Sequence, residues 1–162
     1  AWHQYVDEQK KVSSETMLQC FDNMARDNAR TPMQWTAGKN AGFTDGTPWL
    51  AVNPNYKEIN AEAALKDPDS VFYYYQKLIG LRHTYPIIVY GTFEPLLEDD
   101  ADVYAFARHY EGKTLLVACN WTENEVPCKL FADKDGEELI ANYKQHKENV
   151  LQPYEARVLL LK

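Results

Sequence analysis

The feature that most constrains the fold is a change of hydrophobic period near residue 86. A helix is predicted from about Pro68 to Thr84, because apolar side chains recur there at steps of three and four residues. Pro86 is expected to end this helix. From residue 87 onward, apolar and polar residues alternate in short runs separated by turn residues, which is typical of antiparallel strands. Strands are predicted at residues 87–90, 103–108, 114–120, 126–131, 138–141 and 156–161.

These two patterns predict an α+β chain in two parts, residues 1–86 and residues 87–162. The short strands at regular spacing favour an antiparallel β-sandwich for the second part. The long helix of the first part has a wide apolar face, which suits a helix that packs on a large sheet or barrel. That face comprises Val71, Tyr74, Tyr75, Leu78, Leu81 and Tyr85.

Capping residues predict two shorter helices. Ser13 or Ser14 is suited to cap a helix through residues 15–24, where apolar residues form one stripe. Asn60 is expected to cap a helix at residues 61–66.

Between these helices, residues 36–60 contain three glycines and two prolines, which predicts a long irregular segment. Long loops of this kind often carry function. Phe43, Trp49 and Tyr56 are expected either to anchor the segment to a core or to stack on a ligand.

Charge and composition argue against two classes of partner. The chain has 17 basic and 24 acidic residues, a net charge of −7, so it lacks the basic surface that binds nucleic acid. No apolar run reaches the roughly 18 residues of a membrane-spanning helix, so no membrane partner is expected. The first residues lack the basic and apolar regions of a signal peptide, and the absence of an initiator Met fits an excised fragment.

Motifs for metals, cofactors and common nucleophiles are absent from the sequence. Cys20, Cys119 and Cys128 lack metal-type spacing, and reduced thiols in a cytoplasmic protein are the preferred interpretation. There is no phosphate-binding glycine loop, nucleophile elbow or zinc-binding His pair, so no cofactor or metal site is expected. His83, His109 and His146 are isolated in the sequence and are assigned no catalytic role.

The segment Arg26–Trp35 is the strongest candidate for chemistry. It combines two arginines with an aspartate, two amide side chains and a tryptophan. Pro32 disfavours helix before it, which predicts an extended loop. Arginine offers a fork of donors and tryptophan a flat apolar face, a mixture that matches the hydroxyls and C–H faces of a sugar. The alternative is a surface ion pair between Arg26 and Asp27, with Trp35 in a core.

Five ordered motifs carry a resemblance to a known family. They closely resemble the C-terminal part of the oligo-1,6-glucosidase and dextran glucosidase group of α-glucosidases, in glycoside hydrolase family thirteen. The resemblance runs from about Asp22 to Lys162. Trehalose synthases, sucrose isomerases and trehalose-6-phosphate hydrolases look similar in the same stretch. The motifs are Arg26–Trp35, Asn40–Phe43, Gly46–Trp49, Val52–Lys57 and Phe72–Ile79.

The resemblance implies that residues 1–86 are the end of a (β/α)8 catalytic barrel and that residues 87–162 are a C-terminal β domain. The parent enzyme would hydrolyse α-1,6-glucosidic linkages of short gluco-oligosaccharides with retention. In this family the catalytic carboxylates lie upstream of the first motif, so no catalytic residue is assigned here, and the missing barrel is the expected partner. The family's arginine that contacts the terminal glucose falls in this loop, with Arg30 as the preferred match and Arg26 as the second.

Chain length agrees with this interpretation. The predicted sandwich leaves only residues 1–86 for other structure, whereas a complete barrel takes roughly 200–250 residues. Two alternatives remain open for the β domain, a carbohydrate-binding module and a purely structural one, and the structural role is preferred. The wide apolar face of the long helix also predicts pairing of two copies into a homodimer.

Overall fold

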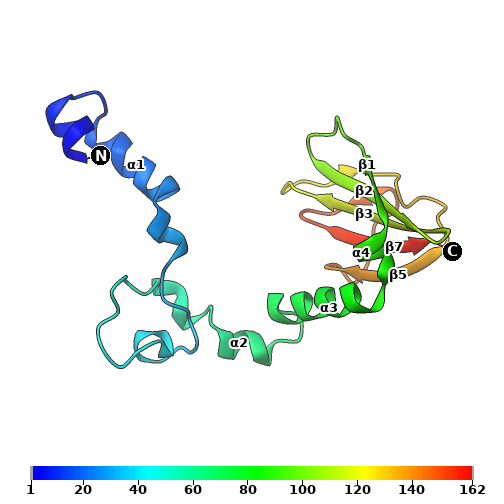
Figure 1. Ribbon diagram of the computed structural model, residues 1–162, viewed down its shortest axis with the longest axis horizontal. Coiled ribbons are helices and arrows are strands. Elements are labelled where there is room, and N and C mark those ends of the chain that lie inside the picture. Colours follow the sequence, from blue (N-terminus) through cyan, green and yellow to red (C-terminus); the bar gives the residue numbers. More distant parts are fainter. Residues whose placement is uncertain (1, 162) are drawn as a thin grey trace. The chain divides into compact units, whose positions relative to one another are not determined.

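The computed structural model describes residues 2–161 and divides into two compact units, Ala1–Ser70 (unit 1) and Val71–Lys162 (unit 2). Unit 1 consists of short helices and turns, and unit 2 combines helices with an antiparallel sheet (Figure 1). The predicted combination of helices with an antiparallel sheet is therefore present. Within residues 2–161, no helix is long and apolar enough to cross a membrane.

Side-chain caps start the two α-helices of unit 1, as predicted. Ser13 Oγ accepts a hydrogen bond from the backbone N–H of Thr16 at 3.1 Å. Asn60 Oδ1 accepts one from Ala63 N–H at 2.9 Å. Each cap satisfies a helix N–H that has no partner within the helix. The elements of the unit are η1 (His3–Glu8), α1 (Ser14–Met24), η2 (Arg26–Ala29), η3 (Lys39–Gly42), η4 (Pro54–Lys57) and α2 (Ala61–Lys66).

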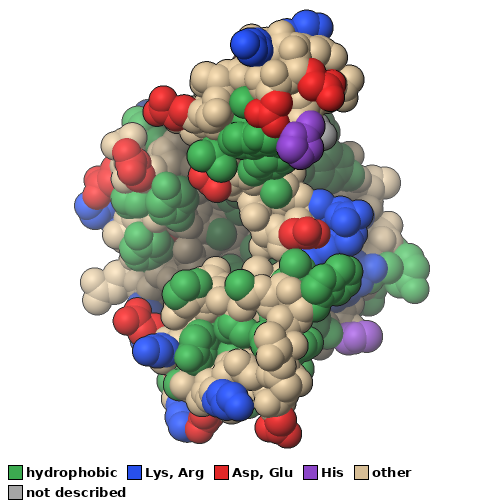
Figure 2. Space-filling view, turned by 90° about the vertical axis from the view of Figure 1, so that its left-hand side faces the viewer, with side chains coloured by type: hydrophobic (Ala, Val, Ile, Leu, Met, Phe, Trp, Pro, Cys, Tyr) green, Lys and Arg blue, Asp and Glu red, His purple; other side chains and the backbone are tan. Residues whose placement is uncertain are grey.

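The apolar stripe of α1 is only partly covered. Met17 is 8% exposed, whereas Leu18, Phe21 and Met24 are 54%, 40% and 84% exposed. Trp2 stacks on Phe21 with ring centroids 6.4 Å apart. Figure 2 shows hydrophobic side chains lying at the surface among charged groups. Unit 1 therefore leaves apolar surface in water that a complete core would bury.

Unit 2 begins with α3 (Val71–Thr84), which starts three residues after the predicted Pro68. Asp67 forms a turn instead, because its Oδ1 accepts from Asp69 N–H at 2.9 Å and its carbonyl accepts from Ser70 N–H at 3.1 Å. The helix ends at Thr84 as predicted.

The strand predicted at residues 87–90 is wrong. These residues belong to a second helix, α4 (Pro86–Tyr90), in which Pro86 occupies the first turn. Proline is well suited there because its missing N–H has no helical partner. Ile87 is 3% exposed and packs on the sheet, so tertiary contact overrides the strand preference of these β-branched residues.

The main sheet has five antiparallel strands in the order β1-β2-β3-β7-β5, and a second pair, β4 and β6, lies outside it (Figure 1). Strand β1 was not predicted, and its sequence is interrupted by Pro95 at the edge of the sheet. The strand predicted at 126–131 is confirmed only in its first two residues. The bounds are β1 (Thr92–Leu96), β2 (Val103–Tyr110), β3 (Lys113–Asn120), β4 (Val126–Pro127), β5 (Gly136–Ala141), β6 (Val150–Leu151) and β7 (Ala156–Leu161).

Both faces of the main sheet carry a hydrophobic cluster. On one face, residues of β2 and β3 pack against the β4 and β6 segments, with Leu151 only 2% exposed. On the other face, residues of β3, β5 and β7 pack against Ile87 of α4, with Leu81 of α3 and Tyr85, which caps α4, at the margin. The strands therefore have apolar residues on both faces, and the end of α3 is held on the sheet.

The rest of α3 is mostly exposed within the described chain, although Tyr73 and Tyr74 are half-buried. None of its residues is fully buried. Packing of this helix on a larger structure stays a prediction. The exposed apolar residues are Val71 (74%), Phe72 (45%), Tyr75 (62%), Leu78 (37%) and Ile79 (55%).

Candidate functional site

The two candidate arginines lie at the surface of unit 1, directly after α1. Arg26 opens η2, and its Nε lies 3.6 Å from Asp27 Oδ1, with both side chains more than half exposed. Arg30 follows η2, where its backbone N–H donates to the Asp27 carbonyl at 3.0 Å and its side chain is exposed. The surface ion pair considered for Arg26 is therefore present. Arg30 offers an exposed guanidinium on a backbone that is fixed by a hydrogen bond.

The first part of the segment is a helical turn, so the prediction of an extended loop is wrong for residues 26–29. The side chain of Asn28 explains this turn. Its Nδ2 donates to the carbonyl oxygens of Phe21 at 3.2 Å and Asp22 at 2.7 Å, at the C-terminal end of α1. These bonds add acceptor contacts to two carbonyls of the last helical turn and hold η2 against α1.

The second part of the segment closes the base of the long loop. Gln34 accepts at its carbonyl from Ala61 N–H at 2.9 Å, and its side-chain amide donates to the carbonyl of Ile59. Trp35 accepts at its carbonyl from Glu62 N–H at 3.0 Å. Residues 34–35 and 59–62 therefore lie side by side, and the intervening residues form a closed loop.

A tight left-handed turn shapes the middle of the loop. Asn40 and Ala41 have φ of 51° and 57°, a region that L residues rarely adopt. The Ala41 carbonyl accepts from the N–H groups of Trp35 and Thr36, and the Asn40 side chain donates to Thr44 and Gly46. Ala41 is fully buried, so the turn forms a small core. The irregular segment predicted at 36–60 is thus an ordered loop.

Three large aromatic residues of the loop at residues 26–60 are exposed, whereas Tyr56 is half-buried. Trp35 is 51%, Phe43 49% and Trp49 98% exposed. The expectation that Trp49 anchors the loop is therefore wrong within residues 2–161, since this part of the chain leaves the ring in water. Trp35 is likewise not in a core here. These rings are free to contact a ligand or another protein surface.

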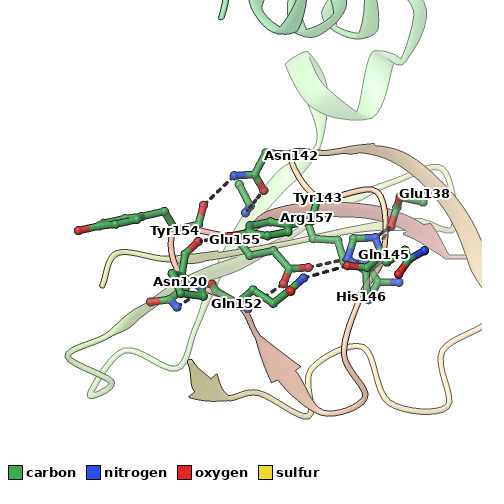
Figure 3. A network of polar contacts seen from close by, with 12 residues as sticks. Asn120, Glu138, Asn142, Tyr143, Gln145, His146, Gln152, Tyr154, Glu155 and Arg157 are labelled. Atoms are coloured by element: carbon green, nitrogen blue, oxygen red, sulfur yellow. Dashed lines mark hydrogen bonds and ion pairs between the residues drawn. The ribbon is translucent and has the colours of Figure 1, made fainter. Parts of the chain in front are cut away.

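A polar network in unit 2 was not predicted from the sequence (Figure 3). Glu155 is fully buried, and its two carboxylate oxygens accept from Gln152 N–H at 2.8 Å and contact His146 Nδ1 at 2.6 Å. His146 Nε2 lies 2.8 Å from Glu138, which also accepts from Arg157 Nε at 2.9 Å. His146 is therefore not isolated. The sequence contained one weak sign of this network, since Glu155 is an acidic residue directly before the apolar strand β7.

A second set of polar contacts is centred on His109, which, like His146, is not isolated. Its Nε2 lies 2.6 Å from Glu94 Oε2, and its Nδ1 lies 3.0 Å from Thr114 Oγ1. The Glu94 side chain is 56% exposed and that of His109 42% exposed. Solvent screens such a pair, so the contacts are cross-strand pairs on the sheet surface.

Neither network is arranged to bind a metal, since residues 2–161 contain no group of three His, Cys, Asp or Glu side chains so placed. The oxygens of Glu155 are already satisfied within the protein. The exposed groups suited to contact a ligand are therefore those of the loop at residues 26–60 and of the sheet surface.

Comparison with known proteins identifies the family. The family model described as "Alpha amylase, catalytic domain" matches residues 2–91, more than half of the chain. The chain belongs to the alpha-amylase catalytic domain family. The match covers unit 1, α3 and α4 and ends where β1 begins, so it includes Arg26 and Arg30.

Among its curated relatives in the alpha-amylase family, this chain is similar to oligo-1,6-glucosidases. The oligo-1,6-glucosidase of Halalkalibacterium halodurans is 49% identical over 158 residues, which is 92% of this chain and 28% of the relative. The chain thus spans about 28% of the length of the curated relatives that it matches.

Solved structures of the alpha-amylase family match nearly the whole chain. The trehalose-6-phosphate hydrolase of Bacillus licheniformis matches with a TM-score of 0.86 and 39% identity over 97% of this chain and 30% of its own. A mutant isomaltulose synthase of Erwinia rhapontici NX5 in complex with D-glucose matches with a TM-score of 0.91 and 40% identity, over 99% and 30%. The fold of this chain is therefore shared by enzymes named for different activities.

Proposed function

We propose that this chain is the C-terminal part of an α-glucosidase that hydrolyses α-1,6-glucosidic linkages of short gluco-oligosaccharides with retention. The observation that carries the proposal is the 49% identity to an oligo-1,6-glucosidase over 92% of the chain. In this proposal residues 1–86 complete the catalytic barrel and residues 87–162 form the C-terminal β domain. The end of the family match at residue 91 supports a division near this position.

The proposal assigns binding to this chain and bond cleavage to another part of the enzyme. Retaining glycosidases need two carboxyl groups about 5–5.5 Å apart. Among residues 2–161 the buried carboxylate is that of Glu155, and its contacts are internal to unit 2. Arg30, with Arg26 as the second candidate, is proposed to hydrogen-bond the outer hydroxyls of the terminal glucose, which positions the sugar for reaction.

The exposed apolar side chains support the proposal that another part of the enzyme packs on this chain. The α3 residues Val71 and Tyr75 and the loop residue Trp49 are 74%, 62% and 98% exposed. Each such side chain gains roughly 1.5–3 kcal/mol on full burial. The upstream part of the enzyme is proposed to cover them.

Reconstitution tests this function. The chain would be co-expressed with the upstream part of the Halalkalibacterium halodurans oligo-1,6-glucosidase, cut where the match begins. We expect a complex that hydrolyses isomaltose and releases the α-anomer first, as read by NMR. A folded complex that does not act on isomaltose would contradict the proposal. Preference for trehalose 6-phosphate or sucrose would move the parent to the trehalose-6-phosphate hydrolases or sucrose isomerases.

A further inference from the structure

A cavity of about 410 Å³ lies in unit 2 at the tip of the β1–β2 hairpin. The hairpin supplies Leu97, Glu98 and Asp100 to its wall, and β2 supplies Val103. Trp121, the first residue after β3, closes one side. The cavity is thus formed by two connected strands and the end of a third, all in the same sheet.

Hydrogen bonds fix the walls of this hairpin cavity. Asp100 N–H donates to the Leu97 carbonyl at 3.0 Å, and Asp100 Oδ1 accepts from the N–H groups of Asp102 and Val103 at 2.9 Å each. The N–H of Trp121 donates to the Asp102 carbonyl at 2.9 Å. The hairpin tip is therefore tied both to its own strand and to the end of β3, so a ligand would meet a largely preformed surface.

The apolar part of the cavity includes a flat aromatic ring. Trp121, directly after β3, is 68% exposed, and Leu97, in the β1–β2 hairpin, is 44% exposed. Val103, at 3% exposed, forms part of the floor. An exposed indole beside an aliphatic floor offers a platform for an apolar face of a ligand, while its N–H remains a donor.

The polar part of the cavity accepts hydrogen bonds. Glu98 is exposed, and one carboxylate oxygen of Asp100 is not used by the turn bonds described above. No Lys or Arg is among the residues that line the cavity. Carboxylates without a nearby cation repel phosphates and carboxylates but accept well from hydroxyl groups. The cavity therefore favours a neutral molecule that has both hydroxyls and apolar C–H faces.

We propose that this hairpin cavity is a binding site for neutral oligosaccharides, with one sugar ring stacked on Trp121 and its hydroxyls donating to Glu98 and Asp100. It lies in unit 2, whereas Arg26 and Arg30 lie in unit 1. The choice of glucose oligomers as ligands rests on the proposed function. The site itself rests on the cavity, the exposed indole and the uncompensated carboxylates.

The test uses the whole 162-residue chain with 15N-labelled tryptophan. The four indole N–H signals, from Trp2, Trp35, Trp49 and Trp121, would be assigned by single Trp→Phe variants. Isomaltotriose and maltotriose would then be titrated up to high millimolar concentration. We expect a saturable shift of the Trp121 signal. Absence of such a shift with both sugars would overturn the proposal.

Matched variants distinguish the loss of ring stacking from unfolding of the chain. Trp121→Ala is expected to weaken binding by roughly tenfold or more, whereas Trp121→Phe keeps a ring and stays within a few-fold. Glu98→Gln, which keeps an acceptor, is expected to have a smaller effect than Trp121→Ala. Trp49→Ala removes a tryptophan of unit 1 that is 98% exposed, and the affinity read from the Trp121 signal should stay unchanged. Equal binding by Trp121→Ala and the unmodified chain, both folded by circular dichroism, would overturn the proposal.

One further titration tests whether the cavity binds another protein surface instead of a sugar. If the Trp121 signal shifts when the upstream enzyme part is added, but not with either sugar, the cavity is a protein contact and the sugar proposal is wrong. Because this readout is binding, its failure leaves the isomaltose assay of the reconstituted enzyme unaffected. Failure of the sugar site can therefore be told apart from failure of the proposed function.

Discussion

His146 Nδ1 lies 2.6 Å from a carboxylate oxygen of Glu155, whose side chain is fully buried. The other ring nitrogen lies 2.8 Å from Glu138. The imidazole therefore bridges the side chains of Glu155 and Glu138. Arg157 adds a second contact to Glu138, from its Nε at 2.9 Å. A buried carboxylate is stable only with such partners.

Replacing His146 by alanine should strongly destabilise unit 2. The substitution leaves the Glu155 carboxylate buried with one bond fewer, and breaking a buried pair in this way costs about 3–5 kcal/mol. The measurement is urea unfolding followed by circular dichroism. Lys147→Ala is the matched control, because Lys147 pairs with Glu125 while both side chains are about half exposed. It should cost less than about 1 kcal/mol. Equal costs for the two variants would show that the network has no special role.

The isolated chain should not hydrolyse glucosides. The reason is that the proposed function places the carboxylate pair in the upstream part of the enzyme. The purified chain would be incubated with isomaltose and with a chromogenic α-glucoside. Turnover that survives controls for host enzymes would show that the chain carries its own catalytic groups.

In the reconstituted enzyme, Arg30→Ala should weaken catalysis without unfolding. A charge-assisted hydrogen bond to the sugar contributes on the order of 1.5–3 kcal/mol, so kcat/KM should fall roughly tenfold to more than a hundredfold. The melting temperature should stay close to the original, since the Arg30 side chain is exposed. Arg26→Ala is the companion variant. If only Arg26→Ala impairs the kinetics, the glucose contact belongs to Arg26.

The isolated chain should form homodimers through α3. Several apolar side chains of this helix are exposed, and pairing of two copies would bury them. Sedimentation equilibrium across a wide concentration range measures the association. Val71→Lys with Tyr75→Lys should weaken it, whereas Tyr154→Lys, at a site that is 58% exposed elsewhere in unit 2, should not. A monomer at every concentration would refute the dimer.

The stability of unit 2 should fall as pH rises above about 9. Burial raises the pKa of the Cys119 and Cys128 thiols above their ordinary value of 9.0. The unfolded chain therefore loses these protons at a lower pH than the folded chain does, so the stabilisation is complete below this value and declines above it. Unfolding free energies at about pH 8 and pH 9.5 measure the slope. Replacing both cysteines by alanine should make this slope shallower.

The sequence predicted elements whose signals are local. Ser13 and Asn60 cap the helices that they were expected to cap, because a cap depends on the next few residues only. Residues 87–90 were predicted as a strand from their β-branched side chains, yet contact of Ile87 with the sheet holds them in a helix. Strand β1 was missed because its pattern is broken by Pro95.

In the candidate site too, residues that adjoin in the sequence could be predicted, and residues brought together by folding could not. Arg26 and Arg30 could be named because their motif is continuous in sequence. The polar network around His146 joins Glu138 of β5, the loop before β6 and the turn before β7, so no spacing rule brings these residues together. The hairpin cavity likewise joins Trp121 to residues of the β1–β2 hairpin through pairing of strands. Register, which only the folded sheet determines, was the missing information.

The position of β7 between β3 and β5 has a consequence for synthesis on the ribosome. Strand β5 is made before β7 and has no other partner in the main sheet. Its backbone edge and the apolar edge of β3 therefore stay open until the last strand emerges. Nascent chains with such open edges are prone to aggregate. The sheet is thus completed only when β7 has followed β5 out of the ribosome, and a chaperone that shields strand edges would act on it in that interval.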